Sequence, residues 1–395
     1  MKKTKLKDIC NISAGGTPSR SNINYWNNGD IPWCKIGDFS GKYINQVKEN
    51  ITEEGLKNSS AKIFKRGTIL YTIFATVGEV AILETESATN QAIAGLEIIN
   101  NEVDLEYLYY YLKSLKFVML KKSRGVAQNN INLGILKNIE IKIPSKIEQI
   151  NIAKILDNIE KIIHKKKKQL KELNTIIKSQ FVEMFDNKNY PKIRLKEVLV
   201  QDQNVEKIEN TRKEKFVTVG INGKGARERI IKDEKWPVPF VGYRVKGGQF
   251  IYSRIDARNG AFAIIPNYLN NAVVSKDFPI FDIDYNKIKP DILLFSLLEE
   301  SFIDIIKNSS FGATNRQRIK ERTFLNYKIY LPPITLQNQF SEIVKQIDKQ
   351  KFESMIQLEK ENKDSINNII KGTIEETTIL YEVLLKKCFE KGKMN

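Results

Sequence analysis

The spacing of hydrophobic residues divides the chain into two kinds of segment. Short apolar or alternating runs such as GTILYTIF, EVAILE and NIEIKIP, separated by Gly, Asn and Pro, predict β-strands in the first 145 positions. A helical pattern at 103–120 interrupts them, which indicates a mixed α+β domain. From Gln149 to Phe185 there is no Gly or Pro, and apolar residues recur at steps of three and four. This spacing predicts one long helix with a heptad seam.

The same order of segments occurs twice. NIEIKIP at 138–144 recurs as NYKIYLP at 326–332, and GTILYTI at 67–73 recurs as GQFIYSR at 248–254. Collinear matches of this kind are typical of a tandem repeat. The second copy should therefore be a second α+β domain followed by a second long helix.

Further matches strengthen the repeat. WCKIG at 33–37 corresponds to FVTVG at 216–220, a second helical pattern lies at 290–307, and a second heptad seam begins at Phe340. A single amphipathic helix is not stable in water, so the two long helices are expected to pair with each other, in antiparallel orientation if the two tandem units are to face the same side. The predicted domains are 1–145 (α+β), 146–189 (helix), 190–332 (α+β) and 333–395 (helix).

Composition points to a polyanionic partner. The 395 residues carry 64 Lys and Arg against 47 Asp and Glu, a net charge of +17, which favours nucleic acid as the ligand. No apolar stretch is long enough to span a membrane, and MKKTKLKDIC lacks the apolar core of a signal peptide, so a cytoplasmic protein without membrane contact is expected. Cys10, Cys34 and Cys388 stand singly, which indicates neither a disulfide framework nor a zinc site.

The sequence lacks the common catalytic motifs. There is no GxxxxGK[ST] loop, and VGINGKGAR at 219–227 does not fit GxGxxG, so it is interpreted as a turn or a contact to the DNA backbone. His164 is the only histidine and lies in a lysine-rich helix, where a solvated position is expected. A Ser/His or Cys/His relay is therefore excluded. We expect no catalytic residue, no metal and no cofactor in this chain.

Polar and basic loop residues are the remaining candidates. Arg binds guanine, Asn and Gln bind adenine, and Lys binds mainly phosphate. GVAQNN at 125–130 aligns with ATNRQR at 313–318, and their different side chains suit two domains that recognise different sequences. The predicted DNA-binding residues are Thr17, Ser19, Arg20, Lys35, Arg66, Arg124, Gln128, Asn129, Asn130, Lys224, Arg227, Arg229, Arg244, Arg254, Arg258, Asn315, Arg316, Gln317 and Arg318.

Several motifs of the first unit occur in a fixed order: GGTPSRSNINYWNNGDIPWCKIGD, GTILYTIFATVGEVAI, ATNQAIAGL, a G-x-x-Q-N-x-I segment, and IKIP ahead of the long helix. This series resembles the target recognition domain of the DNA specificity subunit of type I restriction-modification systems. The second unit resembles the same domain in GATNRQRIKERTFLNYKIYLPPITLQNQF, although it has no GGTPS-like or GDIPW-like stretch. The resemblance covers essentially the whole chain.

The resemblance implies two target recognition domains, each recognising half of a split double-stranded DNA site, on a coiled-coil scaffold. It implies a non-catalytic subunit that binds type I methyltransferase (M) subunits and restriction (R) subunits, which carry the SAM, ATP and Mg chemistry. GGTPSR is then expected to form a loop at the DNA surface. GDIPW is expected to form a rigid buried turn, with Trp33 in the core.

Two alternatives stay open at this point. The first is a freestanding regulator that binds duplex DNA as a fused dimer and needs no partner. The second is a self-contained methyltransferase or nuclease, which the missing motifs disfavour. Adjacent genes for a methyltransferase and a helicase-nuclease would favour the specificity subunit.

Overall fold

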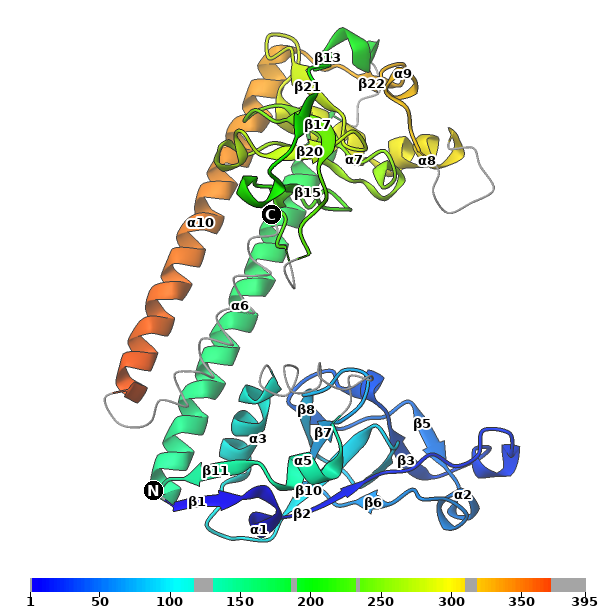
Figure 1. The fold of residues 1–395 in the computed structure, drawn as a ribbon, viewed down its shortest axis with the longest axis vertical. Coiled ribbons are helices and arrows are strands. Elements are labelled where there is room, and N and C mark those ends of the chain that lie inside the picture. Colours follow the sequence, from blue (N-terminus) through cyan, green and yellow to red (C-terminus); the bar gives the residue numbers. More distant parts are fainter. Residues whose placement is uncertain (1, 117–130, 186–189, 232–234, 310–317, 371–395) are drawn as a thin grey trace. The chain divides into compact units, whose positions relative to one another are not determined.

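A computed structural model of the chain describes residues 2–116, 131–185, 190–231, 235–309 and 318–370. Contacts divide these residues into two compact units, of which the first holds 2–164 and 359–370 and the second holds 165–358. Both units combine strands and helices, in agreement with the α+β prediction (Figure 1). None of the described helices has an apolar stretch long enough to cross a membrane.

Three sheets form the first unit. The five-stranded sheet has the order β2-β10-β7-β8-β4, the four-stranded sheet has the order β5-β3-β9-β6, and β1 pairs with β11. The strands are β1 Lys2–Lys5, β2 Cys10–Ala14, β3 Ile31–Cys34, β4 Tyr43–Ile44, β5 Glu49–Ile51, β6 Ile63–Phe64, β7 Ile69–Thr72, β8 Val80–Leu83, β9 Ser87–Thr89, β10 Ile93–Ile98 and β11 Glu140–Ile143.

Four described helices pack against the five-stranded sheet in this unit: α1 Leu6–Ile9, α3 Leu105–Ser114, α5 Leu133–Lys137 and the first part of α6 Lys146–Phe185. The short helix α2 Glu53–Lys57 packs instead on the four-stranded sheet, through Leu56. Leu108 of α3 and Ile152 and Leu156 of α6 belong to one buried cluster with Tyr71 of β7. The apolar seam of α6 therefore starts inside the core of the first unit.

The second unit repeats this plan. Its four-stranded sheet has the order β13-β21-β18-β19, a three-stranded sheet has the order β14-β17-β20, and β12–β22 and β15–β16 form pairs. The strands are β12 Lys192–Arg194, β13 Leu199–Gln201, β14 Glu206–Ile208, β15 Val217–Val219, β16 Ala226–Glu228, β17 Phe240–Arg244, β18 Phe250–Tyr252, β19 Phe262–Ile264, β20 Val273–Ser275, β21 Ile280–Ile283 and β22 Lys328–Tyr330; the helices are α7 Pro290–Leu298, α8 Glu300–Ser309, α9 Glu321–Phe324 and α10 Ile334–Ile370.

Backbone pairings confirm the repeat. Trp33 pairs in parallel with Ala88 in the first unit, and Phe216 forms a parallel bridge with Val273 in the second, as the WCKIG and FVTVG match predicts. The amide of Ile131 donates to the carbonyl of Ile73 at 2.9 Å. Its counterpart Ile319 donates to Arg254 at 3.0 Å. The two domains therefore share the order of four strands in their main sheets, β2-β10-β7-β8 and β13-β21-β18-β19, and also the backbone contact of the isoleucine that follows the GVAQNN and ATNRQR segments.

The two long helices pair inside the second unit. Phe181 of α6 packs on Phe340 of α10 with ring centroids 5.4 Å apart. Toward the other end of the pair, the hydroxyl of Ser354 donates to Gln169 at 3.4 Å. Because residue numbers fall along α6 as they rise along α10, the helices are antiparallel, as predicted. In the second half of α6, Ile177 and Phe181 are buried and lie in one cluster with Val344 and the domain core.

The helical pattern at 290–307 is confirmed, but it forms two helices, α7 and α8, because Glu299 between them is extended, with φ −60° and ψ 140°. In one continuous helix, Phe302 would lie about 140° around the axis from Leu297, whereas both are buried in the same core. One local prediction was wrong: GDIPW is not a turn, since Ile31–Cys34 form β3, which pairs with β5 and β9. Trp33 is 3% exposed, in agreement with its predicted core position.

Phe340 should be a main contributor to the stability of the helix pair. It is fully buried and packs on Phe181, Phe185 and Phe295. We expect Phe340→Ala to lower the free energy of unfolding of the second unit by about 3–5 kcal/mol, measured by urea denaturation and circular dichroism. Phe352→Ala is the matched control, because Phe352 lies on the same helix and is 64% exposed. Equal losses for the two variants would contradict the packing described here.

Candidate nucleic-acid interface

Close packing explains the glycine pair of GGTPSR. A Cβ atom on Gly15 would lie 2.1 Å from Oγ1 of Thr89, and one on Gly16 would lie 2.2 Å from Oγ of Ser60. The Gly16 amide also donates to the carbonyl of Thr89 at 2.8 Å. No side chain fits at either position, so the loop leaves β2 with its backbone directly against β9.

Aromatic residues hold the rest of this loop. The indole N–H of Trp33 donates to the carbonyl of Gly16 at 3.0 Å, and that of Trp26 donates to the carbonyl of Ser19 at 3.1 Å. The guanidinium of Arg20 lies 3.5 Å from the centroid of the Trp26 ring, a distance typical of a cation–π contact. The loop is therefore fixed at both ends by backbone and indole hydrogen bonds.

Two basic side chains of this surface share one carboxylate. Arg20 donates to Glu49 at 2.6 Å, and Lys35 forms an ion pair with the other oxygen of Glu49. Hydrogen bonds from Lys35 and then Arg20 hold the pKa of the Glu49 carboxyl below its usual range. Thr17 is also engaged, because its hydroxyl contacts Gln91. Arg20, Lys35 and Glu49 therefore present more positive than negative charge in a preorganised cluster.

The other predicted residues of the first unit fall elsewhere. Ser19 is exposed on the same loop, and Arg66 is exposed in the turn between β6 and β7. The remaining four lie outside the described residues: Arg124, Gln128, Asn129 and Asn130.

In the second unit, VGINGKGAR forms a hairpin turn, which is one of the two interpretations of its sequence. Asn222, Gly223 and Gly225 adopt positive φ values of 56°, 67° and 72° between β15 and β16, a conformation that favours Asn and Gly. The turn exposes Lys224, and the strand after it carries Arg227 and leads to the exposed Arg229. This hairpin groups three of the predicted DNA-binding residues on one element.

Other predicted arginines of the second unit are held by acidic neighbours. Arg244 donates to Glu206 at 2.6 Å, to Glu214 at 2.9 Å and to the carbonyl of Asn271 at 2.7 Å. The hydrogen bond to Glu214, aided by Glu206, raises the pKa of Arg244 despite its partial burial. A contact of Arg244 to DNA stays a prediction, and it would require these ion pairs to open.

Three further positions complete the comparison with the sequence. Arg254 forms an ion pair with Glu321, and Arg318 forms one with Asp277 at 3.1 Å. Arg258 lies half-buried in a short 3₁₀ segment. Asn315, Arg316 and Gln317 lie outside the described residues.

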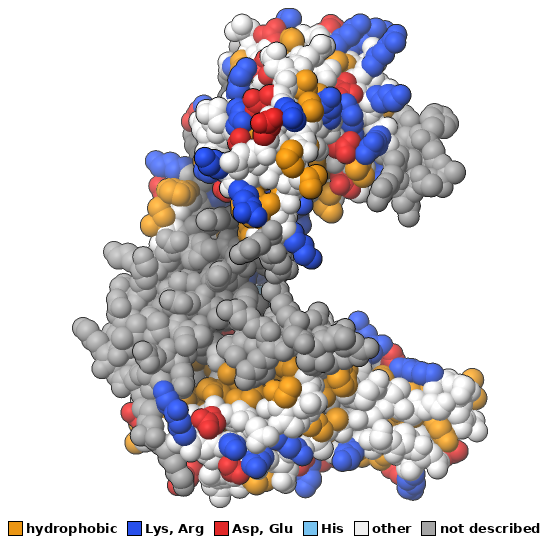
Figure 2. Space-filling view, viewed as in Figure 1, with side chains coloured by type: hydrophobic (Ala, Val, Ile, Leu, Met, Phe, Trp, Pro, Cys, Tyr) orange, Lys and Arg blue, Asp and Glu red, His pale blue; other side chains and the backbone are white. Residues whose placement is uncertain are grey.

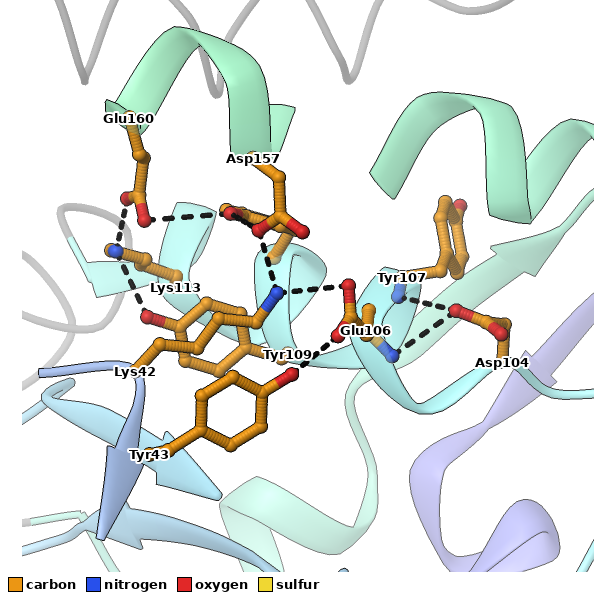
Figure 3. Close-up of polar contacts among 10 residues, drawn as sticks. Lys42, Tyr43, Asp104, Glu106, Tyr107, Tyr109, Lys113, Asp157 and Glu160 are labelled. Atoms are coloured by element: carbon orange, nitrogen blue, oxygen red, sulfur yellow. Dashed lines mark hydrogen bonds and ion pairs between the residues drawn. The ribbon is translucent and has the colours of Figure 1, made fainter. Parts of the chain in front are cut away.

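Sequence reasoning missed a polar network that ties α6 to the first domain (Figure 3). Lys42 contacts Asp157 of α6 at 2.7 Å and Glu106 of α3 at 2.9 Å. One turn further along α6, Glu160 pairs with Lys113 of α3. The positions of these partners along the chain are more than 40 residues apart, and no local pattern in the sequence marks them.

The network fixes the ionisation of its central carboxylate. Burial alone would raise the pKa of Asp157, but hydrogen bonds from Lys42 and Tyr110 bring it below its usual range. Lys42 itself has only 12% of its side chain exposed. Figure 3 shows Lys42 and Lys113 pointing from the domain toward the acidic side chains of α6. The joint between domain and helix is therefore held by charge as well as by the apolar core.

Basic side chains lie on both units. On the face shown in Figure 2, Lys and Arg side chains cover parts of each described surface, with Asp and Glu between them. Among the described residues, no group of three or more His, Cys, Asp or Glu side chains is arranged to hold a metal ion. His164 is exposed on α6, as expected.

Comparison with known proteins identifies a single family. The family model described as "Type I restriction modification DNA specificity domain" matches residues 1–175 and 187–368. The type I restriction enzyme MjaIX specificity subunit of Methanocaldococcus jannaschii is 38% identical over 188 residues, which cover 46% of this chain and 42% of that protein. This chain therefore spans less than half of that relative in the alignment.

A second relative and one solved structure match over nearly the full length. The putative type I restriction enzyme MjaX specificity subunit of the same organism is 25% identical over 414 residues, covering 95% of this chain and 93% of that protein. A structure reported for complex assembly and conformational transition of the type I R-M system has a TM-score of 0.51 at 14% identity, covering 96% of each chain. The structural match supports the fold alone.

The glycine pair gives a stability prediction. Gly15→Ala places a methyl group against the Thr89 side chain and backbone. The variant should therefore have a free energy of unfolding lower by at least about 1–3 kcal/mol. Gly41→Ala is the control, because a Cβ atom there meets nothing within 4 Å. Urea denaturation of both variants measures the difference. Equal stability of the two variants would show that the loop does not pack as described.

The polar network gives a second prediction. Lys42→Met leaves Asp157 and Glu106 half-buried without their shared cation, which should cost about 1–3 kcal/mol in thermal or urea unfolding near neutral pH. Lys57→Met is the control, because Lys57 is 75% exposed and pairs with the exposed Glu53 on its own helix.

The cost of Lys42→Met should also depend on pH. The pKa of Asp157 is lowered in the folded state, so its contribution is present above the unfolded value of about 3.9 and is lost as the pH falls through the folded value. The difference between the parent and Lys42→Met should therefore shrink below about pH 4. A difference that stays constant down to pH 2 would exclude Asp157 as the partner.

Proposed function

The chain belongs to the type I restriction modification DNA specificity family, and on that premise we propose that its two units recognise the two halves of a split duplex DNA site. The observation that carries this proposal is the tandem repeat, in which two domains whose main sheets share four strands in the same order are each followed by a long helix. Two similar domains with different loop side chains suit two different half-sites. The chain then supplies specificity and no catalytic group.

The proposed recognition domains are residues 1–145 and 190–332, and the proposed scaffold is the helices at 146–189 and 333–395. In the first domain, the preorganised cluster of Arg20 on the GGTPSR loop and Lys35 directly after β3 supports a DNA contact. In the second, the β15–β16 hairpin supports one, because its exposed tip carries Lys224 and leads to Arg229. Phosphate contacts from such residues position a domain, and base contacts specify the sequence.

We further propose that the paired helices bind the methyltransferase and restriction subunits of a type I complex, in the cytoplasm. The proposed partners would carry SAM, ATP and Mg. The proposal is supported by family membership and by the antiparallel pairing of α6 with α10.

Exchange of one domain tests the two-domain proposal. Replacing residues 1–145 by the corresponding residues of a relative should change one half of the target and leave the other half unchanged. With a junction after residue 145, Lys42 comes from the donor and Asp157 from the parent, so their contact is at risk. A second chimera with the junction after His164 takes both positions from the donor. Both chimeras are co-expressed with the parental methyltransferase subunit, and their methylated sites are mapped by sequencing.

The outcome separates the proposal from its alternative. A chimera that changes both halves would contradict independent recognition by the two domains. Specific binding by the purified chain alone, without any methylation in the presence of the partner subunits, would favour a freestanding regulator built as a fused dimer.

A further inference from the structure

A glutamine occupies the same buried place at the start of each long helix. Gln149 is the fourth residue of α6 and Gln337 is the fourth residue of α10, and neither has any exposed surface. Buried amides need hydrogen-bond partners, because an unpaired polar group in the core is costly.

In the first unit, the amide of Gln149 uses both of its hydrogens and its oxygen. Its Nε2 donates to the carbonyl of Glu102 at 2.8 Å and to that of Pro144 at 3.0 Å. Its Oε1 accepts from the backbone N–H of Asp104 at 2.8 Å. The amide therefore ties the first turn of α6 to the backbone that starts α3.

In the second unit, Gln337 makes the same three bonds. Its Nε2 donates to the carbonyl of Lys287 at 3.1 Å and to that of Pro332 at 2.8 Å, and its Oε1 accepts from the N–H of Lys289 at 2.9 Å. These partners start α7. We call this arrangement, a buried glutamine with its three hydrogen bonds, the glutamine clamp. Each unit has one. With two carbonyls and one N–H as partners, the orientation of each amide is unambiguous.

The other contacts at the two joints differ in chemistry. In the first unit, Lys146 donates to the carbonyls of Asn101 and Val103, and Asp157 joins the polar network. In the second unit, the corresponding contact between the long helix and the domain is the aromatic packing of Phe340 of α10 on Phe295 of α7. The glutamine clamp is thus common to both joints, although the side chains around it have diverged.

Directional bonds can set an angle that apolar contacts cannot. Hydrogen bonds weaken steeply when donor and acceptor are misaligned, whereas hydrophobic contact is non-directional and tolerates sliding. The clamp joins the start of a long helix to the start of a domain helix, so rotation between them breaks at least one of its three bonds. Over the length of α6, a small rotation at the first turn becomes a large displacement at the far end.

We propose that the glutamine clamp is a positioning device, which fixes the direction in which each long helix leaves its recognition domain and so sets the spacer length between the half-sites. This inference rests on the proposed function. Gln149 and Gln337 contact no DNA in this mechanism, and they act through the helices that they orient.

Gln149→Met and Gln337→Met test the proposal, because methionine has a similar length and no polar group to make the three bonds. Gln180→Met is the matched control, since that amide donates to Glu183 on the same helix. The full chain, co-purified with its methyltransferase subunit, selects DNA from two libraries. One keeps the parental half-sites and varies the spacer by one or two base pairs, and the other keeps the spacer and randomises the half-sites.

Each clamp variant should lose spacer discrimination and keep base preference. We expect the preference for the parental spacer over spacers one base pair longer or shorter to fall at least fivefold, with half-site sequences unchanged and Gln180→Met equal to the parent. A role limited to stability would lower the melting temperature and leave the spacer preference at the parental level, which would overturn the proposal. Loss of base preference at the half-sites to the same degree as loss of spacer discrimination would also overturn it.

Two further controls keep the result decisive. If a methionine variant does not fold, Gln149→Asn or Gln337→Asn takes its place, because asparagine keeps the amide but shortens its reach, and the same loss of spacer discrimination is expected. A parental chain that selects no split site would overturn the proposed function and the positioning role together. A parental chain that selects a split site with an unchanged spacer preference in the variants would overturn the positioning role alone.

Discussion

Burial of one face of each long helix is the constraint on which the rest of this structure depends. An isolated helix with the sequence of α6, which has 40 residues, would expose its apolar seam to water and would not be stable. Its first turns bury Ile152 and Leu156 in the core of the first unit, and its last turns bury Ile177 and Phe181 in the core of the second. The single helix α6 therefore contributes side chains to two hydrophobic cores. Each of these cores needs part of a helix that also extends beyond it.

The two joints between domain and helix show how a repeat diverges while its geometry stays the same. Charge holds the first joint, where Lys42 contacts Asp157, and aromatic packing holds the second, where Phe340 meets Phe295. A charged joint is selective in its partners because an unpaired carboxylate in a half-buried site is unfavourable. Aromatic rings contribute instead mainly through the large apolar area that they bury. The clamp glutamines give both joints the directional bonds that the aromatic joint would otherwise lack.

The GGTPSR segment has a structural role that its motif alone does not reveal. Its glycines are required because β9 and Ser60 leave no space for a Cβ atom. Its Arg20 lies on Trp26 and donates to Glu49, so the loop is organised before any ligand arrives. The β15–β16 hairpin of the second unit reaches an exposed basic tip by another route, through Asn and Gly residues at positive φ. Preorganised loops of either kind lose less conformational entropy on binding.

The sequence by itself determined the repeat, the α+β class, the two long helices and their antiparallel pairing, because strand alternation and heptad spacing are local patterns that survive in a single chain. It also placed Trp33 in the core and gave a turn as one of two interpretations of VGINGKGAR. The tertiary structure alone decided that 290–307 breaks at Glu299, that Ile31–Cys34 form a strand, and that Arg244 is held by Glu206 and Glu214. Two of the three partners of Gln149 lie 45 and 47 residues away along the chain. Contacts between residues so far apart depend on how the elements pack, and no periodicity along the sequence encodes them.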